Sequence, residues 1–376
     1  MEFKVNSKEL EKLLGKIIPA VPTRTPMPIL ENFLFEVKDG LLTIYATDLE
    51  ISLKSSLSIA TEDNIKLVVP ARLLNDIVRS LNDTTIHFKL TSNKKINLIT
   101  DTGKYVISYL DPDEFPDIPS VTEDKNVKDL NEVVINGVEL RQAFEKTSFA
   151  MSKEEMRPAM MGTLFEFTDD GLRFVTTDGH RLVNMLKKNI KANFNQQYVV
   201  PERAVSVLLK ILDEKDVKIY LTKSYVSFKL NDIELITRLI AQKYPDYNSV
   251  IPLENEFALK INTKDIHNSI KRMMLFSTST TRRVKFSIKK DSLEISAEDL
   301  DIGASGEEKV VCEYSGDDLE IGFNSAYVND VLNHMSDNEE IIFKLHSPTK
   351  AVIIEPVVKK ENQDLMMLLM PVRLNT

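Results

Sequence analysis

Three copies of one plan run through the chain, and this internal repeat constrains the fold more than any other feature of the sequence. Each copy opens with an Asn that ends an alternating stretch and is followed three residues later by Glu or Asp. These residues are Asn6, Asn136 and Asn262, separated by 130 and then 126 residues. An Asn side chain in such a place accepts hydrogen bonds from the first free N–H groups of a helix. Each copy is therefore predicted to begin with a strand that leads into a helix.

Further landmarks recur in the same order. Asp48, Asp178 and Asp299 each end a β-branched or alternating stretch, and we interpret this repeated Asp as a turn-forming residue. A second helix of about a dozen residues is predicted to start near 69–72, 200–203 and 323–326. Phe-Pro-Asp at 115–117 and Tyr-Pro-Asp at 244–246 close the first two copies.

The repeat sets the domain organisation. Its period is far longer than the roughly 20–50 residues of a solenoid repeat, so each copy is a whole domain. We expect an α+β chain of three domains, 1–125, 126–253 and 254–376, each with two helices and otherwise strands. The acidic segment 113–129 is predicted to be a linker. Arcs of similar domains can close into rings through a symmetric dimer.

Composition excludes several classes of protein. The net charge of −9 argues against a protein that holds nucleic acid by charge alone, unless its basic residues gather on one surface. The single cysteine, Cys312, excludes an internal disulfide and any multi-cysteine zinc motif. No membrane span or signal peptide is evident, so we expect a cytoplasmic protein.

More specific motifs lie in fixed order: Met27-Pro28-Ile29-Leu30, Ala46-Thr47-Asp48-Leu49-Glu50, Thr177-Asp178-Gly179-His180-Arg181-Leu182, Tyr244-Pro245-Asp246-Tyr247, Ile321-Gly322-Phe323-Asn324 with Tyr327, and Met370-Pro371-Val372-Arg373-Leu374. Each alone is weak. Together, over essentially the full chain, they resemble the bacterial sliding clamp, the β subunit of DNA polymerase III.

The resemblance implies a non-catalytic ring without a cofactor or a metal. Two chains would join head to tail, with helices lining a hole around duplex DNA and sheets outside. Such a ring binds DNA without regard to sequence and confers processivity. Its implied partners are the replicative polymerase, an ATP-driven clamp loader and repair proteins, which dock through short linear peptides.

The resemblance also implies a partner-peptide pocket. Carried over residue by residue, the pocket would use Met160, Thr177, Gly179, His180, Arg181, Leu182, Pro245, Val250, Asn324, Tyr327, Leu368, Met370, Pro371 and Val372. Apolar and Met side chains suit an adaptable floor, and a Tyr supplies a rigid wall with a polar tip. The alternative is that these are ordinary core residues. Ser249 departs from the Arg that some relatives carry.

Two other surfaces follow from the resemblance. The DNA-contacting residues would be Arg24, Lys12, Arg72, Arg79, Arg141, Lys146, Arg203, Lys210 and Lys271. In an ordinary protein those on helices would simply form a solvated face. The dimer interface would join Tyr105 and Ile107 to Leu275 and Phe276 of the second chain, although the latter two also suit a core at the end of a helix.

Two rival functions stay open on the sequence. An enzyme would use Asp178 and His180 as a catalytic pair, but no nucleophile motif or phosphate-binding glycine loop accompanies them. A repeat-domain scaffold would bind proteins without encircling DNA.

Overall fold

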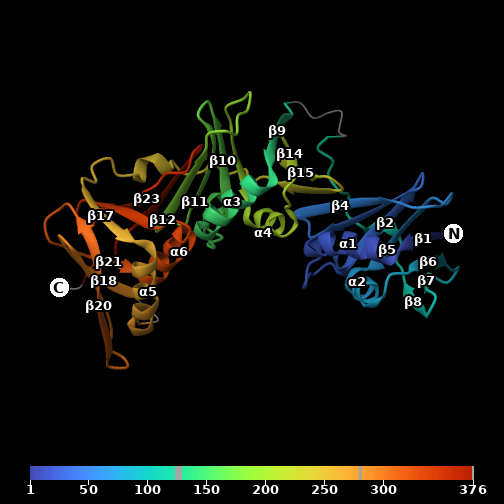
Figure 1. Cartoon of the computed structure of the whole chain (residues 1–376). Coiled ribbons are helices and arrows are strands. Elements are labelled where there is room, and N and C mark those ends of the chain that lie inside the picture. Colours follow the sequence, from blue (N-terminus) through green and yellow to red (C-terminus); the bar gives the residue numbers. More distant parts are fainter. Residues whose placement is uncertain (123–128, 279–281, 375–376) are drawn as a thin grey trace. The chain divides into compact units, whose positions relative to one another are not determined.

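The structure, a computed structural model, describes residues 1–122, 129–278 and 282–374. The first repeat contains β1 (Glu2–Asn6), α1 (Ser7–Ile17), β2 (Asn32–Lys38), β3 (Leu41–Thr47), β4 (Ile51–Ser58), β5 (Ile65–Pro70), α2 (Ala71–Ser80), β6 (Thr85–Leu90), β7 (Lys95–Ile99) and β8 (Lys104–Ser108). Figure 1 labels these elements along the chain.

The second and third repeats contain the same elements in the same order. The second has β9 (Asn131–Asn136), α3 (Gly137–Thr147), β10 (Gly162–Thr168), β11 (Gly171–Thr177), β12 (Arg181–Lys187), β13 (Gln197–Pro201), α4 (Glu202–Ile211), β14 (Asp216–Leu221), β15 (Tyr225–Leu230) and β16 (Ile233–Arg238). The third has β17 (Phe257–Asn262), α5 (Thr263–Met273), β18 (Arg283–Lys289), β19 (Ser292–Asp299), β20 (Ala304–Tyr314), β21 (Leu319–Asn324), α6 (Ser325–Met335), β22 (Glu340–Leu345), β23 (Val352–Pro356) and β24 (Gln363–Leu369).

Strand order is identical in the three repeats. One set of four strands runs β1-β6-β7-β8, β9-β14-β15-β16 and β17-β22-β23-β24; the other runs β5-β2-β3-β4, β13-β10-β11-β12 and β21-β18-β19-β20. The three-domain α+β fold predicted from the repeat is confirmed. Two antiparallel pairings then join one repeat to the next, β4 with β16 and β12 with β24.

Because these pairings cross the repeats, the chain divides into two compact units. One holds Met1–Arg141 with Arg203–Leu239, and the other holds Gln142–Glu202 with Ile240–Thr376. The middle repeat contributes one set of strands to each. The boundary predicted at 125 and 126 lies outside the described residues, as do residues 123–128 of the predicted linker.

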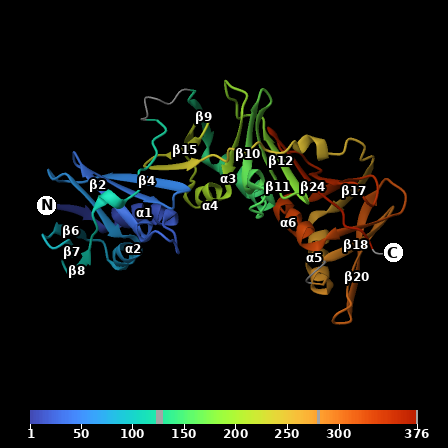
Figure 2. The ribbon, with the colours of Figure 1, turned by 180° about the vertical axis from the view of Figure 1, so that it is seen from behind.

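Local sequence explains the start of the helices. Asn6 accepts hydrogen bonds from the backbone N–H of Lys8 and Glu9 at 2.8 and 3.2 Å, and Asn262 caps α5 in the same way. Asn136 accepts from Val138 at 3.0 Å. The helix starts predicted at these asparagines are confirmed. Helices α5 and α6 lie side by side in the second unit, as both ribbon views show (Figures 1 and 2).

Within the described ranges, no helix combines the length and the apolar character that a bilayer crossing requires. The same ranges contain no group of three or more His, Cys, Asp or Glu side chains placed to hold a metal ion.

Candidate functional sites

The turn between β11 and β12 is built by Asp178. Its Oδ1 accepts hydrogen bonds from the backbone N–H of His180 at 2.9 Å and of Arg181 at 3.0 Å. Asp48 builds the equivalent turn through Glu50 and Ile51 at 3.1 and 2.9 Å. The interpretation of this Asp as turn-forming is confirmed. An enzymatic use of Asp178 would compete with this structural role.

Arg181 is the centre of a buried polar cluster in the second unit. Its side chain is 10% exposed, and Nε lies 3.1 Å from Asp178 Oδ2 while Nη1 pairs with Asp330 on α6. Nη2 donates to the Phe149 carbonyl at 2.8 Å. The guanidinium carbon lies 4.7 Å from the centre of the Tyr327 ring, within cation–π range. The guanidinium of Arg181 thus contacts two aspartates, a backbone carbonyl and the Tyr327 ring at once.

Two histidines extend the aromatic cluster around Tyr327 and Phe149. The His180 ring stacks on Tyr327 with centroids 5.9 Å apart. His334 stacks on Phe149 at 4.0 Å, and its Nδ1 lies 2.7 Å from the Asp330 carbonyl oxygen. Burial lowers the pKa of His334 below its usual value, because the charged imidazolium loses hydration there.

The floor of this region is apolar. Leu182 on β12 pairs with Leu368 on β24, and both belong to a buried cluster with Tyr244 and Tyr247. Burial raises the pKa of the Tyr247 phenol, and its hydroxyl donates to Glu166, which raises that pKa further. Leu182 and Leu368 are thus core residues that support the floor, as the alternative reading of the sequence allowed.

The C-terminal segment closes one side of the region. The Met370 N–H donates to the His180 carbonyl at 2.8 Å, and the Val372 N–H donates to the Gly322 carbonyl at 2.8 Å. Met370 is 39% exposed, while Pro371 and Val372 are half-buried. Asn324 uses its side chain to cap α6 through the Ala326 N–H.

A surface hollow of about 290 Å³ lies beside the turn between β11 and β12, where Arg157 and Met160 approach Gly179. Its lining includes Met160 and Pro245, which the sequence predicted, and Arg157, Gln242 and Lys243, which it did not. The Arg157 Nη1 lies 2.9 Å from where a Cβ on Gly179 would be, and Gly179 has a φ of +89°. In the sequence, Arg157, Gln242 and Lys243 could have been found only through their nearness to Met160 and Pro245.

Thr177 is buried and its hydroxyl donates to the Arg181 carbonyl, while Val250 is exposed.

The predicted DNA-contacting residues fall into two groups. Arg141 donates to the carbonyls of Leu209 and Leu212 at the end of α4, and Lys146 pairs with Asp337 at 2.6 Å. Arg203 pairs with Asp48 at 2.8 Å. These three cations are held by the chain itself.

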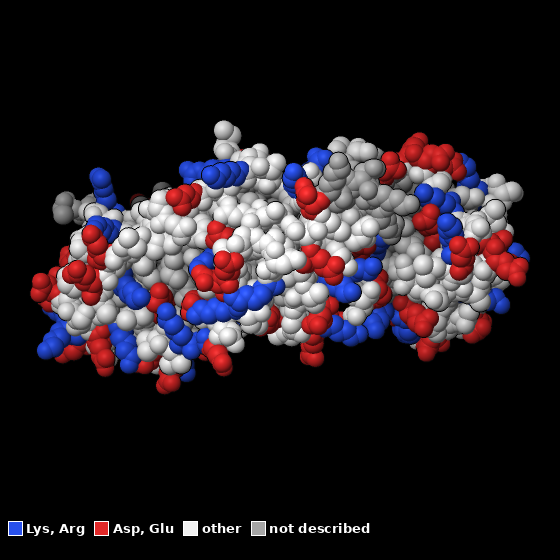
Figure 3. All heavy atoms as spheres, turned by 90° about the horizontal axis from the view of Figure 1, so that it is seen from above, with Lys and Arg blue, Asp and Glu red and all other residues white. Residues whose placement is uncertain are grey.

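The second group is exposed: Arg24, Lys12, Arg79, Lys210 and Lys271. Across the described residues, these five make no hydrogen bond or ion pair with the chain. Arg72 is also exposed, but it belongs to neither group fully, because its Nη2 donates to the carbonyls of Val21 and Pro22 at 3.3 Å. On the face shown in Figure 3, Lys and Arg side chains are interspersed with Asp and Glu, so this face carries no predominant sign.

The predicted dimer residues are only partly on the surface. Leu275 is 74% exposed and Tyr105 is 36% exposed. Ile107 was predicted to face the second chain, but it is buried at 4% because it points into the core of its own sheet. Val106, its neighbour, is exposed instead.

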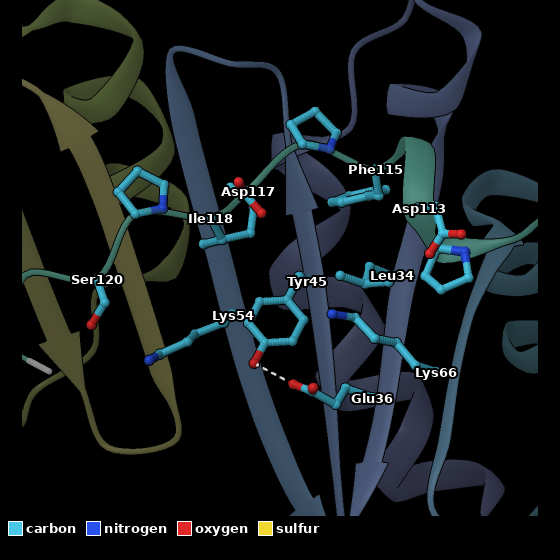
Figure 4. Close-up of a pocket in the computed structure, with 13 residues that line it drawn as sticks. Leu34, Glu36, Tyr45, Lys54, Lys66, Asp113, Phe115, Asp117, Ile118 and Ser120 are labelled. Carbon is cyan, nitrogen blue, oxygen red and sulfur yellow. Dashed lines mark hydrogen bonds between the residues drawn. The ribbon is translucent and has the colours of Figure 1, made fainter. Parts of the chain in front are cut away.

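A further cleft lies on the first unit, beneath the segment Pro112–Ser120 (Figure 4). The strands line it with Leu34, Glu36 and Tyr45, and the segment itself contributes Phe115 and Ile118. The Tyr45 hydroxyl donates to Glu36 at 3.1 Å. In the second repeat Tyr247 occupies the position of Ile118 and donates to the equivalent Glu166.

Three family models match in order: the N-terminal domain of the DNA polymerase III beta subunit at residues 1–119, its central domain at 134–246 and its C-terminal domain at 248–373. A beta sliding clamp from Vibrio cholerae is 28% identical over 379 residues, covering 100% of both chains.

Solved structures agree with that result. The DNA polymerase III subunit beta from Pseudomonas aeruginosa superposes with a TM-score of 0.92 at 28% identity, covering 100% of both chains. A sliding clamp from the same organism bound to griselimycin gives a TM-score of 0.90 at 27% identity, also over 100% of both chains.

Proposed function

Since the chain belongs to the family of the DNA polymerase III β subunit, the sliding clamp, we propose that it forms a closed homodimeric ring around duplex DNA in the cytoplasm. As a member of this family it is a processivity factor and not an enzyme. The observation that carries the ring is the rule by which its repeats join.

That rule connects the last strand of one four-strand set to the next repeat. The first repeat uses β4 to pair with β16 of the second, and the second uses β12 to pair with β24 of the third. The equivalent strand of the third repeat is β20, whose residues 304–311 have a neighbour on one side only, among the described residues. The strand equivalent to β16 and β24 is β8, which ends its sheet. Applied once more, the rule pairs β20 with β8 of a second copy, in two symmetric places.

The same rule gives a register. Leu53 pairs with Leu235, and Val183 pairs with Met367. Gly306 is the residue of β20 that is equivalent to Leu53 and Val183. Thr47, Thr177 and Glu298 each directly precede the repeated Asp, and their cross-strand partners directly precede Leu53, Val183 and Gly306. The residue of β8 equivalent to Leu235 and Met367 is Tyr105, which lies opposite Leu98. Gly306 therefore lies opposite the partner's Tyr105.

Side chains at this register are complementary. A Cβ on Gly306 would lie 2.7 Å from Phe276, so only a glycine leaves the aromatic ring its place beside the partner's Tyr105. Glu307 then lies opposite the partner's Lys104, and both are exposed. Opposite charges directly across two strands stabilise their pairing.

A disulfide tests the register. Directly opposite Cα atoms lie about 4.5–5.5 Å apart, within the range that a disulfide spans. Glu307→Cys with Lys104→Cys should oxidise to covalent dimers. Glu307→Cys with Tyr105→Cys, whose side chains point to opposite faces, should not. Equal cross-linking of both pairs, or a monomer by sedimentation at micromolar concentration, would exclude this interface and favour the scaffold.

The region around Tyr327, His180, Met160, Pro245 and the C-terminal segment is proposed as the site for the polymerase, clamp-loader and repair-protein peptides. Its support is an apolar floor with a ring wall held by Arg181. Lys12, Arg79, Lys210, Lys271 and Arg24 are proposed to contact phosphates, since they are free cations. Arg72 can contribute with its remaining donors, whereas Arg141, Lys146 and Arg203 are assigned to helix and turn contacts.

Topological loading tests the function as a whole. Labelled protein is loaded onto a nicked circular plasmid with a compatible clamp loader and ATP, washed in high salt, and half the sample is then linearised. Retention on circles with loss from linear ends is the expected result. Equal loss from both, while a control clamp is retained by the same loader, would refute encirclement.

A further inference from the structure

Each repeat ends with a segment that crosses back to the free edge of its other four-strand set. In the first repeat, Val68 on β5 exchanges backbone hydrogen bonds with Leu110 at 3.0 and 2.8 Å. In the second, the Ile240 N–H donates to the Val199 carbonyl on β13 at 3.0 Å. In the third, Gly322 on β21 bridges to Val372, which donates to its carbonyl at 2.8 Å. Val68, Val199 and Gly322 are equivalent, since each lies two residues before the last residue of its edge strand.

The third repeat differs at this position by lacking a side chain. A Cβ on Gly322 would lie 2.7 Å from the Val372 carbonyl oxygen, a backbone atom that cannot rotate away. It would also lie 2.9 Å from Leu374 Cδ2. The Leu374 side chain thus occupies the space that a valine side chain fills in the other two repeats.

From this geometry we infer that Gly322 is a positioning residue for partner binding, which rests on the proposed peptide site. It lets the segment Met370–Leu374 close on β21 with Leu374 seated over it. The packing of Leu374 against Gly322 fixes one end of the segment, and the hydrogen bond from the Met370 N–H to the His180 carbonyl fixes the other. Met370, Pro371 and Val372 are fixed between these two points, along the candidate peptide site.

A restored valine is the direct test. Gly322→Val installs the residue that the other two repeats carry, so β-strand propensity does not oppose it. The C-terminal segment must then move away from β21. The probe is griselimycin, measured by calorimetry. Gly322→Val should weaken its binding by about tenfold or more, which at 25 °C is about 1.4 kcal/mol.

Hydrogen exchange separates this route from a general loss of structure. The Val372 amide should lose its protection in Gly322→Val, while amides that join β18 to β21 keep theirs. Leu374→Ala, which alters only the seated side chain, should weaken binding in the same direction, and the double variant should bind no worse than Gly322→Val alone. Gly15→Ala is the matched control, because a Cβ there meets nothing within 4 Å, and it should bind griselimycin as the unaltered chain does.

Two results would overturn the inference. One is an unprotected Val372 amide with unchanged affinity, and the other is weakened affinity with Val372 still protected. If the unaltered chain does not bind griselimycin, the peptide site itself is wrong, while the exchange of Val372 still reports whether Gly322 seats the segment.

Discussion

Replacing Arg181 with Met tests whether the buried guanidinium organises the candidate peptide site. Met keeps much of the apolar volume between Phe149 and Tyr327, while the charge disappears. Asp178, with a side chain 15% exposed, and Asp330, 39% exposed, then lose their common cation. Removing one partner of a fully buried ion pair costs about 3–5 kcal/mol. Because Asp330 is partly hydrated, we take the lower end, about 3 kcal/mol.

Hydrogen exchange measures this cost locally, which matters because a chain of several domains does not unfold in one step. A loss of about 3 kcal/mol in opening free energy raises the exchange rate of the affected amides by about a hundredfold. The acceleration should appear in β12 and α6. Asp330→Asn in the Arg181→Met background should recover part of the loss, since it removes one unpaired charge.

Arg173→Met is the matched control for this experiment. Arg173 lies on the neighbouring strand β11, and its closest approach to Asp170, which is 76% exposed, is 3.8 Å. Because the Asp170 carboxylate is largely hydrated and the two groups are far apart, this pair contributes about 0–1 kcal/mol, and exchange in β12 should change little. An Arg181→Met protein whose β12 and α6 amides exchange no faster than those of the control would refute the argument that Arg181 organises the site.

Other perturbations follow from charge and burial. Burial lowers the pKa of His334 in the folded chain, so the unfolded chain binds a proton on this imidazole more readily. The free energy of unfolding of the second unit should therefore fall as the pH drops below about 6.5. His334→Gln should flatten that part of the profile of chemical-denaturation stability against pH. Burial raises the pKa of Cys312 to about 11, so at pH 8 its alkylation should be more than tenfold slower than in urea-unfolded chain, and equal rates would contradict its burial. Lys12→Ala should weaken DNA association of the loaded ring and lower the slope of log affinity against log salt by about 1; Arg141→Met should instead speed exchange at the end of α4 and leave the salt slope unchanged.

The repeat allowed much of the fold to be predicted from sequence. Asn6 and Asn262 cap helices through local hydrogen bonds, and Asp48 and Asp178 build turns in the same way. Such contacts join residues within three positions of one another, so the sequence contains both partners. The same residue types recur at equivalent places in the repeats, and this recurrence indicated that the Asn and Asp residues shape helix starts and turns.

Edge and core residues of β8 could not be distinguished with the same ease. Tyr105 and Ile107 lie two residues apart and therefore share one face of the strand. The sequence predicted that both contact a second chain. Ile107 lies opposite Ile96 and is covered by its own domain. Tyr105 remains partly exposed on that face. The difference in exposure between Tyr105 and Ile107 depends on which side chains from other strands cover each position, and the residue spacing along β8 does not indicate it.

The basic helix residues show a second limit, which has a physical cause. The last carbonyls of a helix have no partner within it and attract cations. Arg141 reaches the end of α4, and Lys146 reaches the His334 carbonyl near the end of α6. A cation that satisfies such carbonyls is not free to neutralise a phosphate without exposing them. Lys12 and Lys210 have the same charge and make no such contact with the described chain, so they are the residues at which DNA affinity and helix stability can be altered independently.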